Sequence, residues 1–236
     1  MKFESELIPG TLVKRYKRFF VDIKIKNITI TAHCPNTGSM MGLLKKGNKV
    51  WVTKNNNPKR KLKYTLQIIK TQNSKVGINT LITNNIFHEA LKDNKIKIFG
   101  KLIKIKREQK FGKNTRFDFL IESKKKKIFI EIKNVTLVRK KGIAEFPDAK
   151  TSRGVKHLQE LINASKKGFD IYIVYIIQRE DCEFFSIAND IDKEYAELLT
   201  EATKKKLKIV CFDCKFTSKG IDINKCLKFL NYENRF

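Results

Sequence analysis

The chain has 236 residues, of which 51 are Lys or Arg and 24 are Asp or Glu, so its formal net charge is +27. This length allows one large domain or two small ones with a buried core. A pI near 9.9 favours a polyanionic partner. Nucleic acid fits better than an acidic membrane surface, because no basic amphipathic helix is evident. Only nine of the basic residues are Arg and the rest are Lys, so part of the charge reflects a coding bias toward AT-rich codons.

Targeting signals and cysteine spacing indicate where the chain resides. The longest apolar run, residues 171–177, has the length of a strand rather than a membrane span. The first ten residues lack the basic start and apolar stretch of a signal peptide, so we expect a cytoplasmic protein. An odd number of cysteines without framework spacing predicts reduced thiols. These cysteines are Cys34, Cys182, Cys211, Cys214 and Cys226.

Residues 1–82 are rich in β-forming residues. Alternating runs over residues 11–26, 28–33, 49–54 and 62–72 are separated by clusters of Gly, Pro and Asn. Several short strands at this spacing are typical of a small barrel. We therefore predict an OB-like barrel as the first domain.

A turn-rich loop, residues 33–40, lies between two of these runs. A metal site on His33 and Cys34 would need a second pair of ligands, and the sequence offers no matching pair. A polar, glycine-containing loop that offers backbone N–H groups to a phosphate is the better interpretation.

A basic cluster precedes the last of the β-rich runs. It contains Lys59, Arg60, Lys61 and Lys63 and is followed by Tyr64. Cations suit phosphates, and an exposed base can stack on an aromatic ring. The alternative is a solvated turn that leads into a strand. We expect the cluster to contact DNA and Tyr64 to pack in the core.

Residues 83–236 change in character and predict a mixed sheet flanked by helices. Helices are expected over residues 83–93 with a polar N-terminal cap, over a segment capped by Thr151 or Ser152 that ends near 167, and over 192–206. Strands are expected over 96–106, 116–135 as a hairpin, 171–178 and 208–212, with a turn at 109–114 and a loop at 145–154. The resulting order is α-β-β-β-α-β followed by a further α-β.

The hairpin is the most informative part of this domain. Two alternating runs, residues 116–122 and 128–135, are joined by a five-residue basic turn. Alternation predicts one core face and one solvent face. The predicted core face carries Phe117, Phe119, Ile121, Ile128, Ile130 and Ile132. The predicted solvent face carries Arg116, Asp118, Phe129, Glu131 and Lys133.

A turn centred between residues 124 and 125 would set Asp118 directly opposite Glu131. Opposed residues on one face lie roughly 5 Å apart at Cβ, and two carboxylates at that distance repel each other. A divalent cation would relieve the repulsion, and hard oxygen ligands suit Mg²⁺. Lys133, on the same face, is placed to hold or polarise a water molecule. The alternative is an ordinary hairpin with charged residues on its solvent face.

The order of elements and the pattern Asp118…Glu131-x-Lys133 resemble the PD-(D/E)XK nuclease-like superfamily. Longer stretches that extend over nearly the whole chain resemble one family, the sugar fermentation stimulation protein (SfsA) family. These stretches are His33-Cys-Pro-Asn-Thr-Gly-Ser-Met40, Asn57-Pro-Lys-Arg-Lys-Leu-x-Tyr-Thr65, Val76-Gly-Ile-Asn-Thr80, Arg116-x-Asp-Phe119, Glu131-x-Lys-Asn-Val-Thr-Leu-Val138 and Phe146-Pro-Asp-Ala-x-Thr-x-Arg-Gly-x-Lys-His-Leu158.

This resemblance implies an OB-like barrel over residues 1–82, followed by a PD-(D/E)XK nuclease-like domain over residues 83–236. It also implies double-stranded DNA as the partner, bound with little sequence specificity. The sequence leaves the oligomeric state open.

The resemblance also implies roles for individual residues. Asp118 and Glu131 would be ligands of Mg²⁺ or Mn²⁺, with the backbone carbonyl of Ile132 as a further ligand. Lys133 would activate the attacking water and stabilise developing phosphoryl charge. Glu89 matches an acidic helix residue that some superfamily members use near the metal; its alternative role is an exposed helix carboxylate.

Other residues near these motifs have more than one interpretation. Gln178 could add polar groups at the rim of the site. Asp148 does not correspond to the first acidic ligand, since it follows the E-x-K element; it could touch substrate or brace Arg153 and Lys156. These two basic residues and Arg116 are expected to contact DNA, and the start of their helix favours a phosphate. His157 is either a partly buried helix residue or a proton carrier.

A lone C-x-x-C, Cys211 and Cys214, would need a further ligand to hold zinc, and none can be placed.

Three functions remain open at this point. The first is a Mg²⁺-dependent DNA endonuclease, favoured because a pure DNA-binding protein has no physical need for opposed carboxylates that repel phosphates. The second is a non-catalytic DNA-binding regulator of sugar-metabolism genes with a vestigial site. The third is an RNA-binding or RNA-processing protein, for which no residue pattern selects the ribose hydroxyl.

Overall fold

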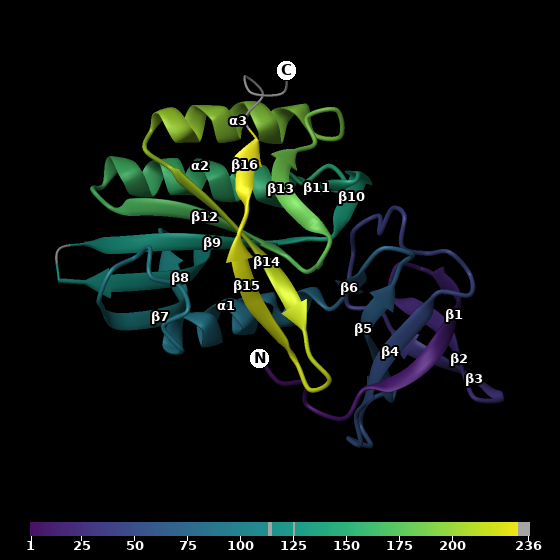
Figure 1. Cartoon of the computed structure of the whole chain (residues 1–236). Helices are drawn as coiled ribbons and strands as arrows, with labels where there is room; N and C mark the ends of the chain where they lie inside the picture. Colours follow the sequence, from purple (N-terminus) through teal and green to yellow (C-terminus); the bar gives the residue numbers. More distant parts are fainter. Residues whose placement is uncertain (113–114, 125, 231–236) are drawn as a thin grey trace.

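The computed structural model describes residues 1–112, 115–124 and 126–230. A small β-barrel lies beside a larger domain in which helices cover a twisted sheet (Figure 1). The turn position Lys125, two residues of the turn predicted at 109–114, and the last six residues of the second predicted domain lie outside the described residues.

The first domain is a closed barrel of five strands. They are β1 (Ile8–Tyr16), β2 (Phe20–Ile25), β3 (Ile28–His33), β4 (Lys49–Lys54) and β5 (Tyr64–Lys70), followed by the short β6 (Lys75–Gly77). The order is β3-β2-β1-β4-β5-β6, and a parallel pairing of β3 with β5 closes the barrel. Inward-facing aliphatic residues such as Leu12, Ile23 and Leu66 fill it. The predicted OB-like barrel is confirmed.

A 3₁₀ turn (Thr80–Ile82) leads without interruption into α1 (Thr83–Lys92). The predicted start of this helix is correct, but its polar cap is not. The N-cap position is Ile82, which makes no capping hydrogen bond, because the preceding turn already continues into the helix. Thr83 Oγ1 instead donates to the carbonyl of Thr80 at 2.9 Å.

The central sheet of the second domain has the order β15-β14-β12-β9-β8-β7. Its strands are β7 (Leu102–Phe111), β8 (Thr115–Ser123), β9 (Lys127–Val135), β12 (Asp170–Ile177), β14 (Lys208–Phe216) and β15 (Ile221–Cys226). Strand β12 runs parallel to both β9 and β14, whereas β7, β8 and β15 are antiparallel to their neighbours. This is the mixed sheet that the sequence predicts.

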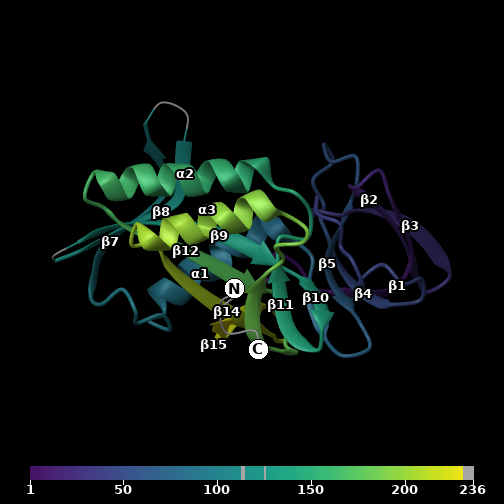
Figure 2. The same cartoon turned by 90° about the horizontal axis from the view of Figure 1, so that it is seen from above.

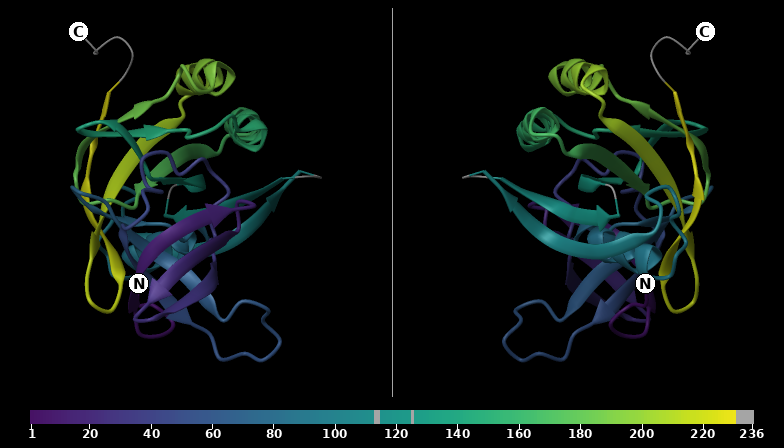
Figure 3. Two further views of the ribbon diagram at one scale, coloured as in Figure 1. Left: turned by 90° about the vertical axis from the view of Figure 1, so that its right-hand side faces the viewer. Right: turned by 90° about the vertical axis from the view of Figure 1, so that its left-hand side faces the viewer.

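Two helices, α2 (Ser152–Lys166) and α3 (Lys193–Lys204), lie side by side on one face of this sheet, and α1 lies on the other (Figures 2 and 3). Thr151 caps α2 by accepting from the Gly154 N–H, and Asp192 caps α3 by accepting from the Tyr195 N–H. The Thr151 cap is one of the two caps that the sequence predicts for α2, whereas the cap by Asp192 was not predicted.

A second, four-stranded sheet has the order β10-β11-β13-β16. It consists of β10 (Leu137–Lys140), β11 (Gly142–Phe146), β13 (Cys182–Ile187) and β16 (Lys228–Leu230). These strands were not predicted. Strands β11, β13 and β16 pair in parallel with partners distant in the sequence. Strands β10 and β11 form a local antiparallel pair, but with 4 and 5 residues they are too short to show clear alternation.

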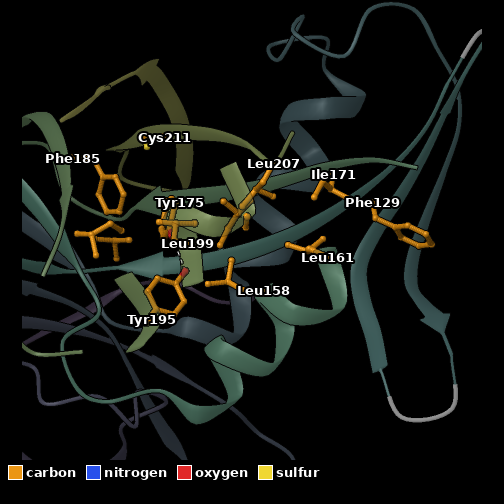
Figure 4. Close-up of a cluster of buried hydrophobic side chains, with 14 of the residues drawn as sticks. Phe129, Leu158, Leu161, Ile171, Tyr175, Phe185, Tyr195, Leu199, Leu207 and Cys211 are labelled. Carbon is orange, nitrogen blue, oxygen red and sulfur yellow. Dashed lines mark hydrogen bonds between the residues drawn. The ribbon is translucent and has the colours of Figure 1, made fainter. Parts of the chain in front are cut away.

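The hairpin of β8 and β9 is buried on both faces, which corrects the predicted solvent face. Phe129 and Glu131 are each 3% exposed. Phe129 packs with residues of α2 and α3 in one core, shown in Figure 4, while Ile130 packs with α1 in the other. Phe117 belongs to the first of these cores, away from Phe119, so the expected alternation breaks at Asp118.

Other boundaries differ by several residues from those expected. The strand predicted over 96–106 begins at Leu102, and the predicted turn at 109–114 starts inside β7, which continues to Phe111. Lys and Ile alternate over residues 95–98 as they would in a strand, so the sequence places the strand too early.

The two domains contact each other at two close approaches to a glycine. A Cβ on Gly77 would collide with Gln178 Oε1, and a Cβ on Gly38 would collide with Asp148 Oδ2. The first three residues pack on the second domain through a bridge between Lys2 and Gly220, although the predicted boundary assigns them to the barrel. Among the described residues, no helix has the length and apolar character needed to cross a membrane.

Candidate active site

The register of the β8–β9 hairpin agrees with the prediction. Phe119 pairs with Ile130 and Ile121 with Ile128, which makes Asp118 and Glu131 the next residues in line. The backbone pairing ends at Phe119 and Ile130, and beyond it the Asp118 side chain makes the next hydrogen bond to β9. Its Oδ2 accepts the Ile132 N–H at 2.7 Å. The carboxylate therefore stands where the next ladder hydrogen bond would be.

Asp118 is held from its other side by α1. Asn84 Nδ2 donates to Asp118 Oδ1 at 2.7 Å. Both hydrogen-bond donors are neutral, and the carboxyl is largely enclosed. Burial and the neighbouring Glu131 charge raise the pKa of Asp118 to about 6, although the Ile132 and Asn84 hydrogen bonds and the Lys133 charge act in the opposite direction.

Glu131 lies deeper, under α2. Its Oε1 accepts from Lys133 Nζ at 2.8 Å and contacts His157 Nδ1. Burial alone would raise the pKa of Glu131, but the Lys133 charge and the hydrogen bonds from His157 and Lys133 outweigh it, so the pKa lies below its ordinary value. Glu131 is therefore the permanently charged member of the pair at neutral pH.

The second oxygen of Glu131 is the feature that points to a ligand. Oε2 is buried and has no hydrogen-bond partner among the described residues. A buried carboxylate oxygen normally has a partner, since an unsatisfied one costs the desolvation free energy of the group. With the Asp118 carboxylate beside it, this oxygen suits a hard divalent cation. The donor set therefore fits Mg²⁺ or Mn²⁺.

The donor set is small. Within the described part of the chain, no group of three or more His, Cys, Asp or Glu side chains could hold a metal. The remaining ligands would be the Ile132 carbonyl, water and substrate oxygens, a pattern usual for Mg²⁺, which keeps several waters.

Lys133 also lines a cleft of about 760 Å³ between the two domains. The barrel contributes Arg15 and Arg18, and the loop before α2 with its first turn contributes Lys150 and Arg153. Four basic residues around the mouth of a concave surface concentrate positive potential there. Lys156, the other basic residue predicted on this helix, is exposed one turn further along.

The structure does not bring Glu89 to this site. Its carboxylate lies 3.0 Å from the amino group of Met1 on the opposite side of α1 from Asn84. Five residues correspond to about 140° of helical rotation, so Asn84 and Glu89 cannot face the same strand end. Asn84 takes the place that was predicted for Glu89, and no local pattern marks it.

The predicted DNA-contacting cluster lies on the barrel, away from the carboxylates. Lys59, Lys61 and Lys63 are exposed, whereas Arg60 is half-buried with its Nη2 3.5 Å from Thr65 Oγ1. Tyr64 is only partly buried against the barrel core. On β8, Arg116 is exposed, and its Nη1 lies 3.8 Å from Glu108 Oε2. The contact of these residues with DNA stays a prediction.

Two residues that were predicted near the site connect the domains instead. Asp148 accepts from the Met40 N–H at 3.3 Å and so braces the barrel loop. Gln178 is fully buried and donates to the Asn79 carbonyl, Thr83 and Asn134. Gln178 therefore ties the linker between the domains to the residue that follows Lys133.

The cysteines do not gather into a metal site in the described part of the chain. Cys211 and Cys214 belong to the cores on opposite faces of the sheet, so they cannot share an ion. Cys34 is buried in the barrel with its Sγ 3.6 Å from Met40 Sδ. All five cysteines are free thiols.

Comparison with known families agrees with this architecture. A family model described as "SfsA N-terminal OB domain" matches residues 13–78, and one described as "Sugar fermentation stimulation protein RE domain" matches residues 81–220. The chain belongs to the SfsA family. The fold predicted from the sequence, an OB-like barrel followed by a mixed sheet flanked by helices, is the fold that the structure has.

Relatives in this family align over almost their whole length. A sugar fermentation stimulation protein homolog of Pelagibacter ubique is 52% identical over 98% of this chain and 100% of the relative. A homolog from Ruegeria sp. is 40% identical over 96% of this chain and 99% of the relative. The solved structure of Pyrococcus furiosus SfsA in complex with Ca²⁺ has a TM-score of 0.88, with 27% identity over 98% of each chain.

Proposed function

We propose that this SfsA protein is a Mg²⁺- or Mn²⁺-dependent endonuclease that acts on the phosphodiester bonds of DNA. The observation that carries the proposal is the buried Oε2 of Glu131, which has no hydrogen-bond partner in the described part of the chain and lies beside the Asp118 carboxylate. Two acids beside a lysine that lines a basic cleft are a set that suits metal-assisted phosphodiester hydrolysis. Pyrococcus furiosus SfsA was solved in complex with Ca²⁺, which supports a site for a hard cation in this family.

Asp118 and Glu131 would hold the metal, with the Ile132 carbonyl as a further ligand. A divalent cation bound there would polarise the scissile phosphate and lower the pKa of a bound water. Asn84 and the Ile132 N–H fix the Asp118 carboxylate, and His157 and Lys133 fix the Glu131 carboxylate. The ligands are thus oriented before a metal arrives.

Lys133 has a separate task. Its ammonium group, 2.8 Å from Glu131 Oε1, is held at the edge of the cleft, where a phosphate would enter. There it is placed to orient the attacking water and to stabilise the negative charge that grows on the phosphoryl oxygens. Arg15, Arg18, Lys150 and Arg153 would contact the backbone of double-stranded DNA on either side.

A non-catalytic DNA-binding regulator is the second candidate. The small set of protein ligands favours it, since no third acidic, His or Cys side chain joins Asp118 and Glu131 within the described residues. Such a protein would keep the basic cleft and its DNA affinity but lack cleavage.

The test is to incubate supercoiled, linear and single-stranded DNA, and an RNA of matched sequence, with the protein and Mg²⁺ or Mn²⁺. We expect nicked or linear products from DNA, and Lys133→Met should slow cleavage by about 10²–10³-fold. Asp118→Asn, which removes a proposed metal ligand, should abolish metal-dependent cleavage. Matched controls are Lys193→Met and Asp93→Asn, since both residues are well exposed and far from the site.

If the wild type and both site variants leave every DNA intact, the enzyme proposal is wrong. Salt-dependent DNA binding without cleavage would then favour the regulator. Cleavage of RNA but not of DNA would mean that the substrate is RNA and that the proposed DNA substrate is wrong.

A further inference from the structure

The turn between β1 and β2 carries an exposed aromatic cluster that the proposed chemistry does not use. Tyr16 is 37% exposed and Phe19 is 44% exposed. Among the large apolar side chains exposed in the described part of the chain, these two are the only aromatic ones. Rings left in water forgo hydrophobic stabilisation, so two of them three residues apart, Tyr16 at the end of β1 and Phe19 in the turn, indicate a surface kept for a ligand.

Two of the rings, Tyr16 and Phe20, are held against each other. Tyr16 stacks on Phe20 with centroids 5.6 Å apart and planes 14° from parallel, and its hydroxyl donates to Asp22 Oδ1 at 3.2 Å. Arg15 braces the turn by donating to the Arg18 carbonyl at 2.9 Å, and it also bonds two carbonyls of the 36–38 loop. A preorganised aromatic surface loses little entropy when a ligand binds.

Cations surround these rings. Lys14 Nζ lies 5.4 Å from the centroid of the Tyr16 ring. Lys17 and Arg18 form the turn with φ of 46° and 59°, a conformation that Gly or Asn adopts at lower cost. Basic side chains at strained turn positions fit a role that needs their charge, such as contact with a phosphate backbone.

The aromatic turn adjoins the catalytic cleft. Arg15 and Arg18, on either side of Tyr16 and before Phe19, line the same cleft as Lys133. A nucleic-acid strand in that cleft would therefore meet the rings as it leaves toward the barrel. The loop between the first two strands is also one of the two loops with which OB barrels bind oligonucleotides.

We propose that Phe19 and the stacked Tyr16–Phe20 pair bind unpaired bases of a DNA strand whose backbone runs into the catalytic cleft. Bases within a duplex are covered above and below by their neighbours, so only an unpaired base can offer its face to a ring. Stacking on an aromatic side chain contributes about 1–3 kcal/mol per base and tolerates any sequence. This inference rests on the proposed function and defines its substrate as DNA with a single-stranded segment beside the cleavage point.

The binding test needs no cleavage. The affinity of full-length protein for a 20-nucleotide oligo-dT and for a 20-base-pair duplex is measured without divalent metal at fixed salt. Phe19→Ala should weaken oligo-dT binding by about 5- to 150-fold, in line with the loss of one stacked base. Duplex affinity should change less than about twofold, because backbone contacts remain. The matched control is Ile28→Ala, a 68% exposed apolar residue at another turn of the barrel.

Two further variants separate stacking from mere apolar contact. Phe19→Trp should retain affinity and Phe19→Leu should lose it. Quenching of 2-aminopurine in the oligonucleotide should follow the same order, since quenching reports stacking. Equal oligo-dT affinities of Phe19→Ala and Ile28→Ala, or an equal loss for duplex, would overturn the inference.

The outcome is separable from the fate of the nuclease proposal. Phe19-dependent oligo-dT binding without any cleavage would leave the stacking surface established and the enzyme proposal wrong. Cleavage that depends on Lys133, together with oligo-dT binding that does not depend on Phe19, would support the enzyme proposal and overturn the stacking surface.

Discussion

Strands β8 and β9 each give the candidate site one carboxylate, but they place it in contrasting surroundings. Asp118 on β8 receives hydrogen bonds only from neutral groups, and its pKa is raised to about 6 by burial and by Glu131. Glu131 on β9 is more buried, yet Lys133 and His157 hold its pKa below the ordinary value. Two acids can thus share a nearly dry site because one carries the charge and the other titrates near neutrality.

The contrast predicts opposite contributions to stability as pH changes. Glu131 has a depressed pKa in the folded state, so its stabilisation is present above pH 4.5 and is lost as pH falls through the folded pKa. Asp118 has a raised pKa, so the folded protein holds a proton that the unfolded chain has released. The free energy of unfolding should therefore fall as pH rises from 3.8 to about 6.

The largest effect is expected from Glu131→Ala. The change leaves the Lys133 ammonium, only 12% exposed, without its main partner. Breaking a buried pair in this way costs about 3–5 kcal/mol. Urea unfolding at pH 7 without metal should show the loss, whereas Glu197→Ala on the exposed face of α3 should change stability by less than about 0.5 kcal/mol. A loss under 1 kcal/mol for Glu131→Ala would mean that Lys133 finds Asp118 as an equal partner.

Asp118→Asn should increase the free energy of unfolding, by somewhat less than Glu131→Ala decreases it. An amide cannot ionise, and with a flip of the Asn84 amide it keeps both hydrogen bonds. The metal-free variant should gain up to about 3 kcal/mol over the wild type above pH 6 and nothing at pH 4. Added Ca²⁺ should raise the Tm of the wild type but not of the variant.

Asp93→Asn is the control for that comparison, because Asp93 is an exposed residue at the end of α1. If Asp118→Asn destabilises the protein at pH 8, the raised pKa and the contrast between the two strands are both wrong.

The sequence was sufficient to place the acids opposite each other but not to describe their surroundings. Alternation and turn length together determine strand register, so the pairing of Phe119 with Ile130 was predictable. Alternation also suggested a solvent face, and that was wrong because α2 covers it. Phe129, an apolar residue on the predicted solvent face, indicates that this face is buried. A sheet that is covered on both sides needs apolar residues on both faces.

Residues that come from distant segments were the hardest to assign. Asn84 reaches Asp118 because the 3₁₀ turn sets the rotation of α1, and no periodicity within the helix encodes that angle. His157 contacts Glu131 only once α2 has packed on β9. The basic run near Lys59 drew attention by composition, whereas Tyr16 and Phe19 were taken as part of an ordinary strand because exposure at a turn cannot be read from alternation.

Asn84→Ala tests the weaker of the two hydrogen bonds that hold the Asp118 carboxylate on β8. Its hydrogen bond, at 2.7 Å, favours the ionised form of Asp118, so its removal should raise the pKa of Asp118 further above 6, by about one pH unit. Stability at pH 8 should fall by about 1 kcal/mol, with almost no change at pH 4. The midpoint of metal binding against pH should move upward by the same interval. Asn85→Ala is the matched control, since Asn85 accepts from Arg107 and does not contact Asp118. Identical pH profiles for the two variants would mean that the Asn84 hydrogen bond does not favour the ionised form of Asp118, and that its pKa is set by burial, by Glu131 and by the Ile132 N–H.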